Sequence, residues 1–436
     1  MNILLLGSGG REHAMAYKIA QSKLCEHLYI GPGNAGTAHL GTNVSLDPCD
    51  FPQVAEFVMR HAIEMVVVGP EAPLVEGIAD YFATTPGLSR IKVIGPCKEG
   101  AQLEGSKDFA KEFMARHNIP TAAYRTVTAE TLPKGIAYLN TLKAPYVLKA
   151  DGLAAGKGVL ILDDLKTAEQ ELRSMLLDSK FGKASEKVVI EQYLSGVELS
   201  VFVLTDGKHY MILPTAKDYK RIGDGDTGPN TGGMGSISPV HFADKKFMRK
   251  VEDRIVAPTV KGLQQDGIDY KGFIFVGLMA VPTDDGFDPY VIEYNVRMGD
   301  PETESVFPRI TSDVVELFDH LWESDLHHCT LEIDPRSAAC VMMVAEGYPG
   351  SYRKGAVIHG ADEGQTLGES LVFHAGTKRN EKGELVTNGG RVMCVTTLAD
   401  NMPSALLRTY QNLDSITWEG RTYRHDIGQD LLKMMM

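Results

Sequence analysis

The sequence has few cysteines and no long apolar segment. None of the six cysteines has a close partner of the kind that a zinc knuckle or a redox motif needs, so we expect reduced thiols. Only four consecutive apolar residues precede Gly7, too few for a signal-peptide core, and no later run approaches a membrane span. We therefore expect a cytoplasmic protein without a membrane partner. The cysteines are Cys25, Cys49, Cys97, Cys329, Cys340 and Cys394.

Basic residues are in the minority. The chain has 44 Lys and Arg against 57 Asp and Glu, a formal net charge of −13. A general nucleic-acid binder needs a clustered excess of Lys and Arg, so this charge argues against that class. Small nucleotides remain compatible with it, because acids beyond about 8 Å are largely screened from a pocket with a few local lysines.

The N-terminal region has the pattern of a parallel sheet. Short apolar runs at 3–6, 28–30, 65–68 and 91–94 each end in a Gly- or Pro-rich turn, and helix-like segments lie between them. This alternation predicts a doubly wound α/β sheet, whose ligands bind beyond the carboxyl ends of its strands. The turns at 7–10, 31–36 and 69–71 should therefore share one edge.

The remaining residues predict two further domains. A helix should begin at the N-cap Ser106, and strand patterns over 145–200 and 273–295 predict an α+β domain. After a helix at 312–322, strands at 339–345, 371–374 and 391–397 predict a small strand-rich C-terminal domain. In a chain of 436 residues we expect domains at 1–103, 104–325, with a subdomain at about 123–192, and 326–430.

The motif GSGGREH, from Gly7 to His13, follows the first predicted strand. Backbone N–H groups of Gly9 and Gly10 at a helix start suit a phosphate ester. A dinucleotide fingerprint would need a third glycine where Glu12 stands and an acid where Gly31-Pro-Gly33 stands, which weakens a dehydrogenase interpretation. The alternative is that these glycines serve only a tight turn.

The motif VLKADGLAAGKGV, from Val147 to Val159, is a second candidate phosphate site. Lys149 ends a strand, and Lys157 lies in a loop of small residues that includes Gly152, Gly156 and Gly158. Small residues let backbone close over phosphates, while the lysines supply charge. The order is not that of a Walker A loop. A solvated Gly/Lys turn is the alternative.

Two further strands carry acids. Glu191 leaves an apolar strand at a potential adenine-binding hinge, and Glu198 could accept hydrogen bonds from ribose hydroxyls; alone, both would more simply be solvated strand edges. In VIEYNVRMGDPETE, Glu293 and Asn295 share one strand face and offer the oxygen ligands that Mg²⁺ prefers. Arg297 on the same face can stabilise a transferring phosphoryl group, and the alternative is a cross-strand ion pair.

The segment from Ala216 to Gly235 holds six glycines together with Asp218, Lys220 and Arg221. Its composition predicts no regular element, and a long ordered loop is usually functional. We interpret it as a substrate loop, with a mobile surface insertion as the alternative. The pair His327-His328, followed by Cys329, has no second ligand pair at zinc spacing, so we do not predict a metal site there.

The order of these motifs resembles that of the ATP-grasp superfamily. More narrowly, the chain resembles the phosphoribosylamine–glycine ligase family over nearly its whole length. The matching segments are GSGGREHA, PGNAG, GPEAPL, QLEGSK, DGLAAGKGV, KDYKRIGDGDTGPNTGGMG, RMGDPET, HAGTK and TNGGRV.

The resemblance implies an ATP-dependent ligation of glycine to 5-phosphoribosylamine through glycyl phosphate. It implies a pre-ATP-grasp domain, an ATP-grasp domain whose subdomain closes as a lid, and a monomer or weak dimer. The nucleotide would be held by Lys107, Lys149, Gly152, Gly156, Lys157, Gly158, Glu191 and Glu198, and Mg²⁺ or Mn²⁺ by Glu293 and Asn295. Catalysis would fall to Arg297 and Lys157, and substrate binding to Gly9, Gly10, Gly33, Asn34, Asp218, Lys220, Arg221, Arg297, Asp300 and Glu302.

One departure from the family pattern concerns a second metal ion. The strand before the Glu-x-Asn motif lacks the usual acid, and Asp284 and Asp285 follow only in the turn. Three other functions stay open at this point: a bicarbonate- or formate-activating enzyme of the same fold, a nucleotide-binding regulatory module without catalysis, and a dehydrogenase.

Overall fold

The computed structural model describes residues 1–153, 158–361 and 366–435. Its N-terminal region is a parallel sheet in the order β3-β2-β1-β4-β5, which confirms the predicted doubly wound architecture. The central strands β1 and β4 are apolar and buried on both faces, as parallel strands covered by helices must be. The strands are β1 (Asn2–Gly7), β2 (His27–Pro32), β3 (Thr42–Asn43), β4 (Met65–Val68) and β5 (Lys92–Ile94).

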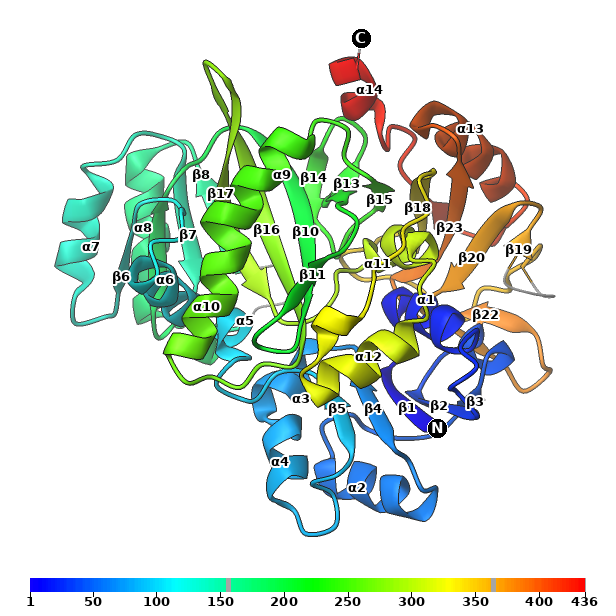
Figure 1. Ribbon diagram of the computed structural model, residues 1–436. Helices are drawn as coiled ribbons and strands as arrows, with labels where there is room; N and C mark the ends of the chain where they lie inside the picture. Colours follow the sequence, from blue (N-terminus) through cyan, green and yellow to red (C-terminus); the bar gives the residue numbers. More distant parts are fainter. Residues whose placement is uncertain (154–157, 362–365, 436) are drawn as a thin grey trace.

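The turns after β1, β2 and β4 lie side by side at one edge of this sheet, as predicted. The Gly33 amide donates to the Gly7 carbonyl over 3.0 Å, and the Gly69 amide donates to the Leu6 carbonyl over 3.0 Å. The covering helices include α12, which is distant in sequence but lies beside β5 (Figure 1). The helices are α1 (Gly10–Ile19), α2 (Phe51–Arg60), α3 (Glu71–Glu76), α4 (Ile78–Thr84) and α12 (Val314–Glu323).

A four-stranded sheet in the order β6-β9-β7-β8 forms the subdomain at one end of the molecule (Figure 1). This subdomain has its own hydrophobic core, which lies under the sheet. The buried residues of that core all fall within the sequence range 127–190. Its elements are β6 (Tyr124–Val127), α7 (Leu132–Leu139), β7 (Tyr146–Ala150), β8 (Val159–Leu162), α8 (Leu165–Leu177) and β9 (Val188–Gln192). The predicted helix before it is confirmed as α6 (Lys107–Arg116), capped by the Ser106 hydroxyl.

The central antiparallel sheet has the order β11-β10-β16-β17 and is covered by α9 and α10 (Figure 1). Tyr294 of β17 points toward α10, where its hydroxyl lies 2.6 Å from that of Thr259. Glu293 and Asn295 therefore project together from the opposite face, as predicted. The elements are β10 (Val197–Thr205), β11 (Tyr210–Ile212), α9 (Lys245–Val251), α10 (Ala257–Gln265), β16 (Gly272–Thr283) and β17 (Gly286–Asn295).

The prediction that residues 216–235 form no regular element is wrong. The segment forms β12 (Lys217–Asp218), the hairpin of β13 (Arg221–Gly223) with β14 (Thr227–Asn230), and the start of β15 (Gly235–Ser238). Gly225 and Asp226 turn the hairpin with φ of +69° and +54°. Glycine therefore supplies the left-handed backbone of a tight turn here, and does not signal an irregular loop.

The C-terminal region is strand-rich, as predicted, but its sheet is not built from C-terminal residues alone. The order is β12-β15-β18-β23-β20-β19, with β24 paired to β18, so two strands from before residue 239 extend it. The other elements are β18 (Ser337–Ala345), β19 (Thr366–Leu367), β20 (Ser370–His374), β21 (Thr377–Arg379), β22 (Leu385–Thr387), β23 (Arg391–Ala399), α13 (Met402–Leu413), β24 (Arg421–Thr422) and α14 (Gln429–Met435). All six cysteines are free, and within the described ranges no helix is long and apolar enough to cross a membrane.

Candidate active site

Glu293, at the end of β17, is the centre of a cluster of charged side chains. Burial raises the pKa of its carboxyl group, but Lys220, Lys149, Lys107 and Arg297 outweigh that effect and hold the pKa below its usual value. These four cations come from four segments separated in sequence. The fold thus brings an ionised carboxylate and four positive charges to one place, as binding of a metal–polyphosphate complex requires.

Glu293 and Asn295 offer one carboxylate and one amide oxygen on the same face. Mg²⁺ typically takes one or two such protein ligands and fills its other positions with water and phosphate oxygens, so this pair fits it. No third acid joins them from β16, because the residue opposite Glu293 is Gly277. Asp285 lies in the hairpin turn, about 27 Å of extended strand away. In the described part of the chain, no group of three or more His, Cys, Asp and Glu side chains could hold a metal.

Lys149 and Glu191 form a buried ion pair between β7 and β9. The Lys149 Nζ lies 2.9 Å from Glu191 Oε2 and donates to the Ile292 carbonyl over 3.3 Å. The other carboxylate oxygen, Glu191 Oε1, lies 3.2 Å from Lys111 Nζ on α6. Burial lowers the pKa of Lys111 to about 8, although Glu191 opposes the shift. Lys111 was missed by the sequence analysis, since an exposed and a buried helical lysine look alike in sequence.

The loop between β7 and β8 is only partly described. The Lys107 Nζ donates to the Gly152 carbonyl over 3.3 Å, which ties the start of α6 to the start of the loop. Burial lowers the pKa of Lys107, and Glu293 opposes that shift. At the other end of the loop, the Gly158 carbonyl accepts from the Ala150 amide over 2.8 Å. The predicted residues Gly156 and Lys157 lie outside the described residues.

The predicted substrate residues of segment 216–235 fall into two groups with different contacts. The Lys220 Nζ lies 3.3 Å from Glu198 Oε2, and Asp218 and Glu198 together raise the pKa of Lys220 well above its usual value. Burial raises the pKa of Asp218. Arg221 is different, because its Nη1 donates to the Gly228 carbonyl over 2.8 Å within the hairpin. Lys220, Asp218 and Glu198 therefore lie together, whereas the Arg221 side chain bonds to the backbone of β14 within its own hairpin.

The RMGDPET segment connects the central sheet to the C-terminal sheet. The Asp300 Oδ1 lies 3.0 Å from Arg391 Nη2 on β23, in the TNGGRV motif. Glu302, at the start of α11 (Thr303–Val306), accepts from the Ser200 hydroxyl over 3.3 Å. Burial, followed by the charge of Asp218, raises the pKa of Glu302 to about 8. Glu302 thus lies beside the Asp218 and Lys220 cluster.

The N-terminal glycine turns lie together, but several of their polar groups already have partners. The Gly9 amide donates to Glu12 Oε2 over 2.7 Å, so an anion at this amide would have to displace that carboxylate. A side chain at Gly10 would lie 2.3 Å from Glu304 Oε1, and Gly33 adopts φ of +71°. The Asn34 side chain donates to the Ser8 and His374 carbonyls and accepts from two amides of its own loop.

Arg297 is held by two carboxylates that the sequence analysis did not identify. Its Nη2 lies 2.8 Å from Glu104 Oε1, and its Nε lies 3.4 Å from Glu71 Oε2. Both acids occur in segments that carry the family resemblance, GPEAPL and QLEGSK. That is the only sequence signal for them, because each lies roughly 200 residues before its partner Arg297.

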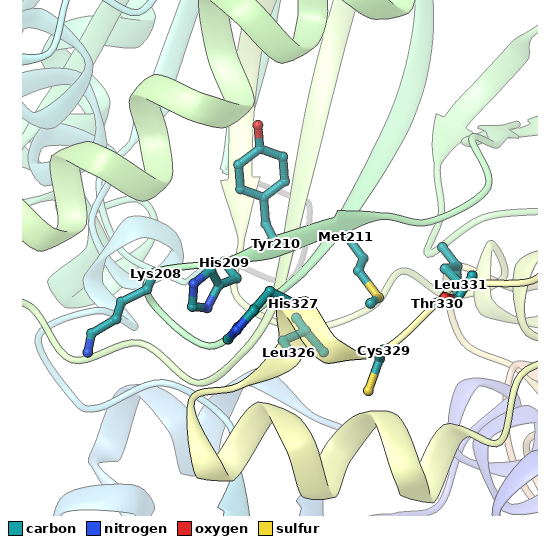
Figure 2. A pocket seen from close by; sticks show the side chains of 9 residues that line it. All are labelled: Lys208, His209, Tyr210, Met211, Leu326, His327, Cys329, Thr330 and Leu331. Atoms are coloured by element: carbon teal, nitrogen blue, oxygen red, sulfur yellow. The ribbon is translucent and has the colours of Figure 1, made fainter.

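A cavity of about 560 Å³ lies away from these residues, between β11 and the segment that contains Leu326 and Cys329. Figure 2 shows the His209 and His327 rings side by side, with centroids 4.3 Å apart. The side chains of Lys208 and Tyr210 point away from these rings (Figure 2). The lining polar groups do not converge on one point, which a binding site for a small charged ligand would require.

Nearly the whole chain is similar to known proteins of one family. Models of the phosphoribosylglycinamide synthetase family match it in order: the N domain over residues 1–104, the ATP-grasp (A) domain over 105–303 and the C domain over 338–430. The phosphoribosylamine–glycine ligase of Escherichia coli is 46% identical over 430 residues, which are 98% of each chain.

Solved structures give the same result. The crystal structure of a phosphoribosylamine–glycine ligase from Thermotoga maritima is 36% identical with a TM-score of 0.81, and the match covers 98% of this chain and 100% of that one. A biotin carboxylase domain from Hydrogenobacter thermophilus, solved with magnesium and ADP, is 17% identical with a TM-score of 0.71. That match covers 96% of this chain and 91% of that domain and shows a common fold only. The chain therefore belongs to the phosphoribosylamine–glycine ligase family, a family of ATP-grasp ligases.

Proposed function

We propose that the protein joins glycine to 5-phosphoribosylamine and converts ATP to ADP and phosphate, in purine biosynthesis. The observation that carries this proposal is the convergence of Lys107, Lys149, Lys220 and Arg297 on Glu293. Four cations around an ionised carboxylate give the charge balance that a triphosphate with a divalent metal needs. The relatives' activity agrees with that arrangement.

In the first step, a glycine carboxylate oxygen attacks the γ-phosphorus of ATP, and the bond from that phosphorus to the β,γ-bridging oxygen breaks. A carboxylate is a poor acyl donor, and phosphorylation provides the leaving group. Lys149 and Lys107 neutralise charge on the nucleotide phosphates, and Lys157, which lies outside the described residues, is a further candidate. Arg297 stabilises the charge of the phosphoryl group during transfer. Glu293 and Asn295 would hold Mg²⁺ or Mn²⁺, which would neutralise further charge on the phosphates.

In the second step, the amine of 5-phosphoribosylamine attacks the carbonyl carbon of glycyl phosphate. The carbon–nitrogen bond forms, phosphate leaves with one of the original carboxylate oxygens, and the amine loses a proton. We assign Asp218, Lys220, Asp300 and Glu302 to substrate binding, since Asp300 lies beside Gly9 and the other three lie together near Glu293. The glycine turns at Gly9, Gly10, Gly33 and Asn34 are the candidate site for the ribose phosphate.

Glycyl phosphate must be protected from water, so we propose that residues 123–192 close over the nucleotide as a lid. The separate core of this subdomain supports a rigid-body motion, because it can move without breaking its own packing. We retain the domain division at 1–103, 104–325 and 326–430, and we propose a cytoplasmic monomer or weak dimer.

The test is ADP release from Mg-ATP with glycine and freshly generated phosphoribosylamine, followed by omission of each substrate in turn. Turnover that requires both substrates supports the proposal. Turnover with bicarbonate or formate in place of glycine would assign the protein to another activity of the same fold. ATP binding without any turnover would support a regulatory module instead.

A further inference from the structure

Glu104 binds both the side chain and the backbone of the segment that follows β17. It lies on the short helix α5 (Gln102–Gly105), which contacts β17 at the end of the central sheet (Figure 1). Its Oε1 lies 2.8 Å from Arg297 Nη2, and its Oε2 accepts from the Val296 amide over 2.8 Å. One carboxylate thus fixes the guanidinium and also the backbone that carries it.

Glu104 is buried, and Arg297 is largely shielded from solvent. The Glu104 side chain is 6% exposed and that of Arg297 is 17% exposed. Burial raises the pKa of Glu104, and the neighbouring Arg297 opposes that rise. Glu71, the second carboxylate near Arg297, is 38% exposed and lies 3.4 Å away, so its hold on the guanidinium is weaker. Glu104 is therefore the main anchor of Arg297.

The other contacts of Arg297 show which way the guanidinium faces. Its Nη2 also donates to Asn295 Oδ1 over 3.2 Å, and its Nη1 donates to the Met298 carbonyl over 3.1 Å. The group is thereby directed toward the face of β17 that carries Glu293. A long, flexible arginine needs such support, because an active-site charge must be held to within about 0.5 Å of its productive position.

We propose that Glu104 is a positioning residue that fixes the Arg297 guanidinium for phosphoryl transfer. This role rests on the proposed function, in which Arg297 stabilises the transferring group. Glu104 itself touches no substrate in this scheme and acts only through Arg297. A purely structural ion pair would affect folding stability but would not affect kcat selectively.

The test is a double-mutant cycle with E104Q and R297K. Glutamine keeps the shape of the side chain and can still accept from the Val296 amide, but it loses the charge that holds the arginine. We expect E104Q to lower kcat about 10- to 100-fold while KM for ATP and glycine changes little. In the R297K background the same change should alter kcat less than about twofold. An equal loss in both backgrounds, or an unchanged kcat in E104Q, overturns the proposal.

Two further measurements keep the test independent of folding and of turnover. E104D retains the charge and should recover part of the kcat lost in E104Q, so it covers the case in which E104Q folds poorly. NMR of arginine-labelled protein, with the Arg297 signal assigned by its loss in R297K, reports the order of the guanidinium directly. Slow rotation in the wild type and averaging in E104Q support the proposal, and identical signals overturn it. This readout remains valid even if the wild type shows no ligase turnover.

Discussion

Lys149 Nζ lies 2.9 Å from Glu191 Oε2, while Lys111 contacts the other oxygen of the same carboxylate. One carboxylate between two lysines leaves a net positive charge where the β6-β9-β7-β8 subdomain meets the central sheet. In the proposed function we expect that surplus to attract nucleotide phosphates. Glu191 is thus a counterion that orients Lys149, and the adenine-hinge role expected for its strand stays a prediction.

Replacement of Lys149 should impair the use of ATP. We expect Lys149→Met to lower kcat/KM for ATP roughly 10²- to 10³-fold, because a preorganised cation facing phosphate is lost. Lys143→Met is the matched control, since Lys143 is exposed in the same subdomain. Steady-state kinetics with ATP as the varied substrate measures the effect. Equal kinetics for the two variants would remove Lys149 from the site.

The two faces of β17 should differ in their effect on metal use. Glu293→Gln should raise the Mg²⁺ concentration needed for half-maximal activity at least about tenfold, since a charged oxygen ligand is lost. Tyr294→Phe should leave that concentration unchanged and cost about 1 kcal/mol of stability, because only its hydrogen bond to Thr259 is lost. Chelation of divalent ions should abolish turnover in both variants. A shifted Mg²⁺ requirement in the Tyr294 variant would contradict the assignment.

Lys220 and Arg221 are neighbours with different expected roles. Lys220→Met should reduce kcat/KM for the substrates roughly 10²-fold, because Lys220 is one of the four cations around Glu293. Arg221→Ala should change kcat/KM by about twofold at most, since among the described residues its guanidinium donates to the Gly228 carbonyl within its own hairpin. Kinetics with glycine and phosphoribosylamine varied separately tests both variants. A larger effect at Arg221 would restore it to the substrate site.

Much of the fold could be predicted because it depends on local patterns. Apolar runs that end in glycine turns indicated the parallel sheet, and the i, i+2 spacing of Glu293 and Asn295 indicated their common face. The hairpin at 221–230 is an exception with an equally local reason, because glycine-rich composition does not exclude regular structure. The positive φ of Gly225 shows that the same residues are what a tight turn requires.

The partners of the charged residues could not be predicted in the same way. Arg297 pairs with Glu104, Lys149 with Glu191, and Asp300 with Arg391, and each pair joins separate elements of the chain. Which acid meets which base depends on the packing of whole domains. No periodicity or spacing within a single element carries that information.

The buried His374 makes stability sensitive to acid. Burial lowers its pKa to about 4, so the folded state takes up its proton well below the ordinary pKa of 6.5. Between about pH 6.5 and pH 4 the unfolded state therefore binds more protons than the folded state. The free energy of unfolding falls as the pH drops through that range. We expect a loss of about 2 kcal/mol from this residue between pH 7.5 and pH 5.

Urea unfolding at both pH values measures this contribution. The loss of stability between pH 7.5 and pH 5 should be smaller in His374→Gln than in the wild type by about that amount. His359→Gln, at an exposed position, should behave like the wild type. An identical pH dependence in all three proteins would contradict the prediction.

The most direct test of the proposed chemistry follows the oxygen atoms of glycine. Glycine labelled with ¹⁸O in its carboxylate is incubated with the enzyme, Mg-ATP and phosphoribosylamine, and the released phosphate is analysed by mass spectrometry. A glycyl phosphate intermediate predicts one ¹⁸O atom in each phosphate and one in the amide product. Unlabelled phosphate, or label in AMP, would show that the carboxylate does not attack the γ-phosphorus and would contradict the account.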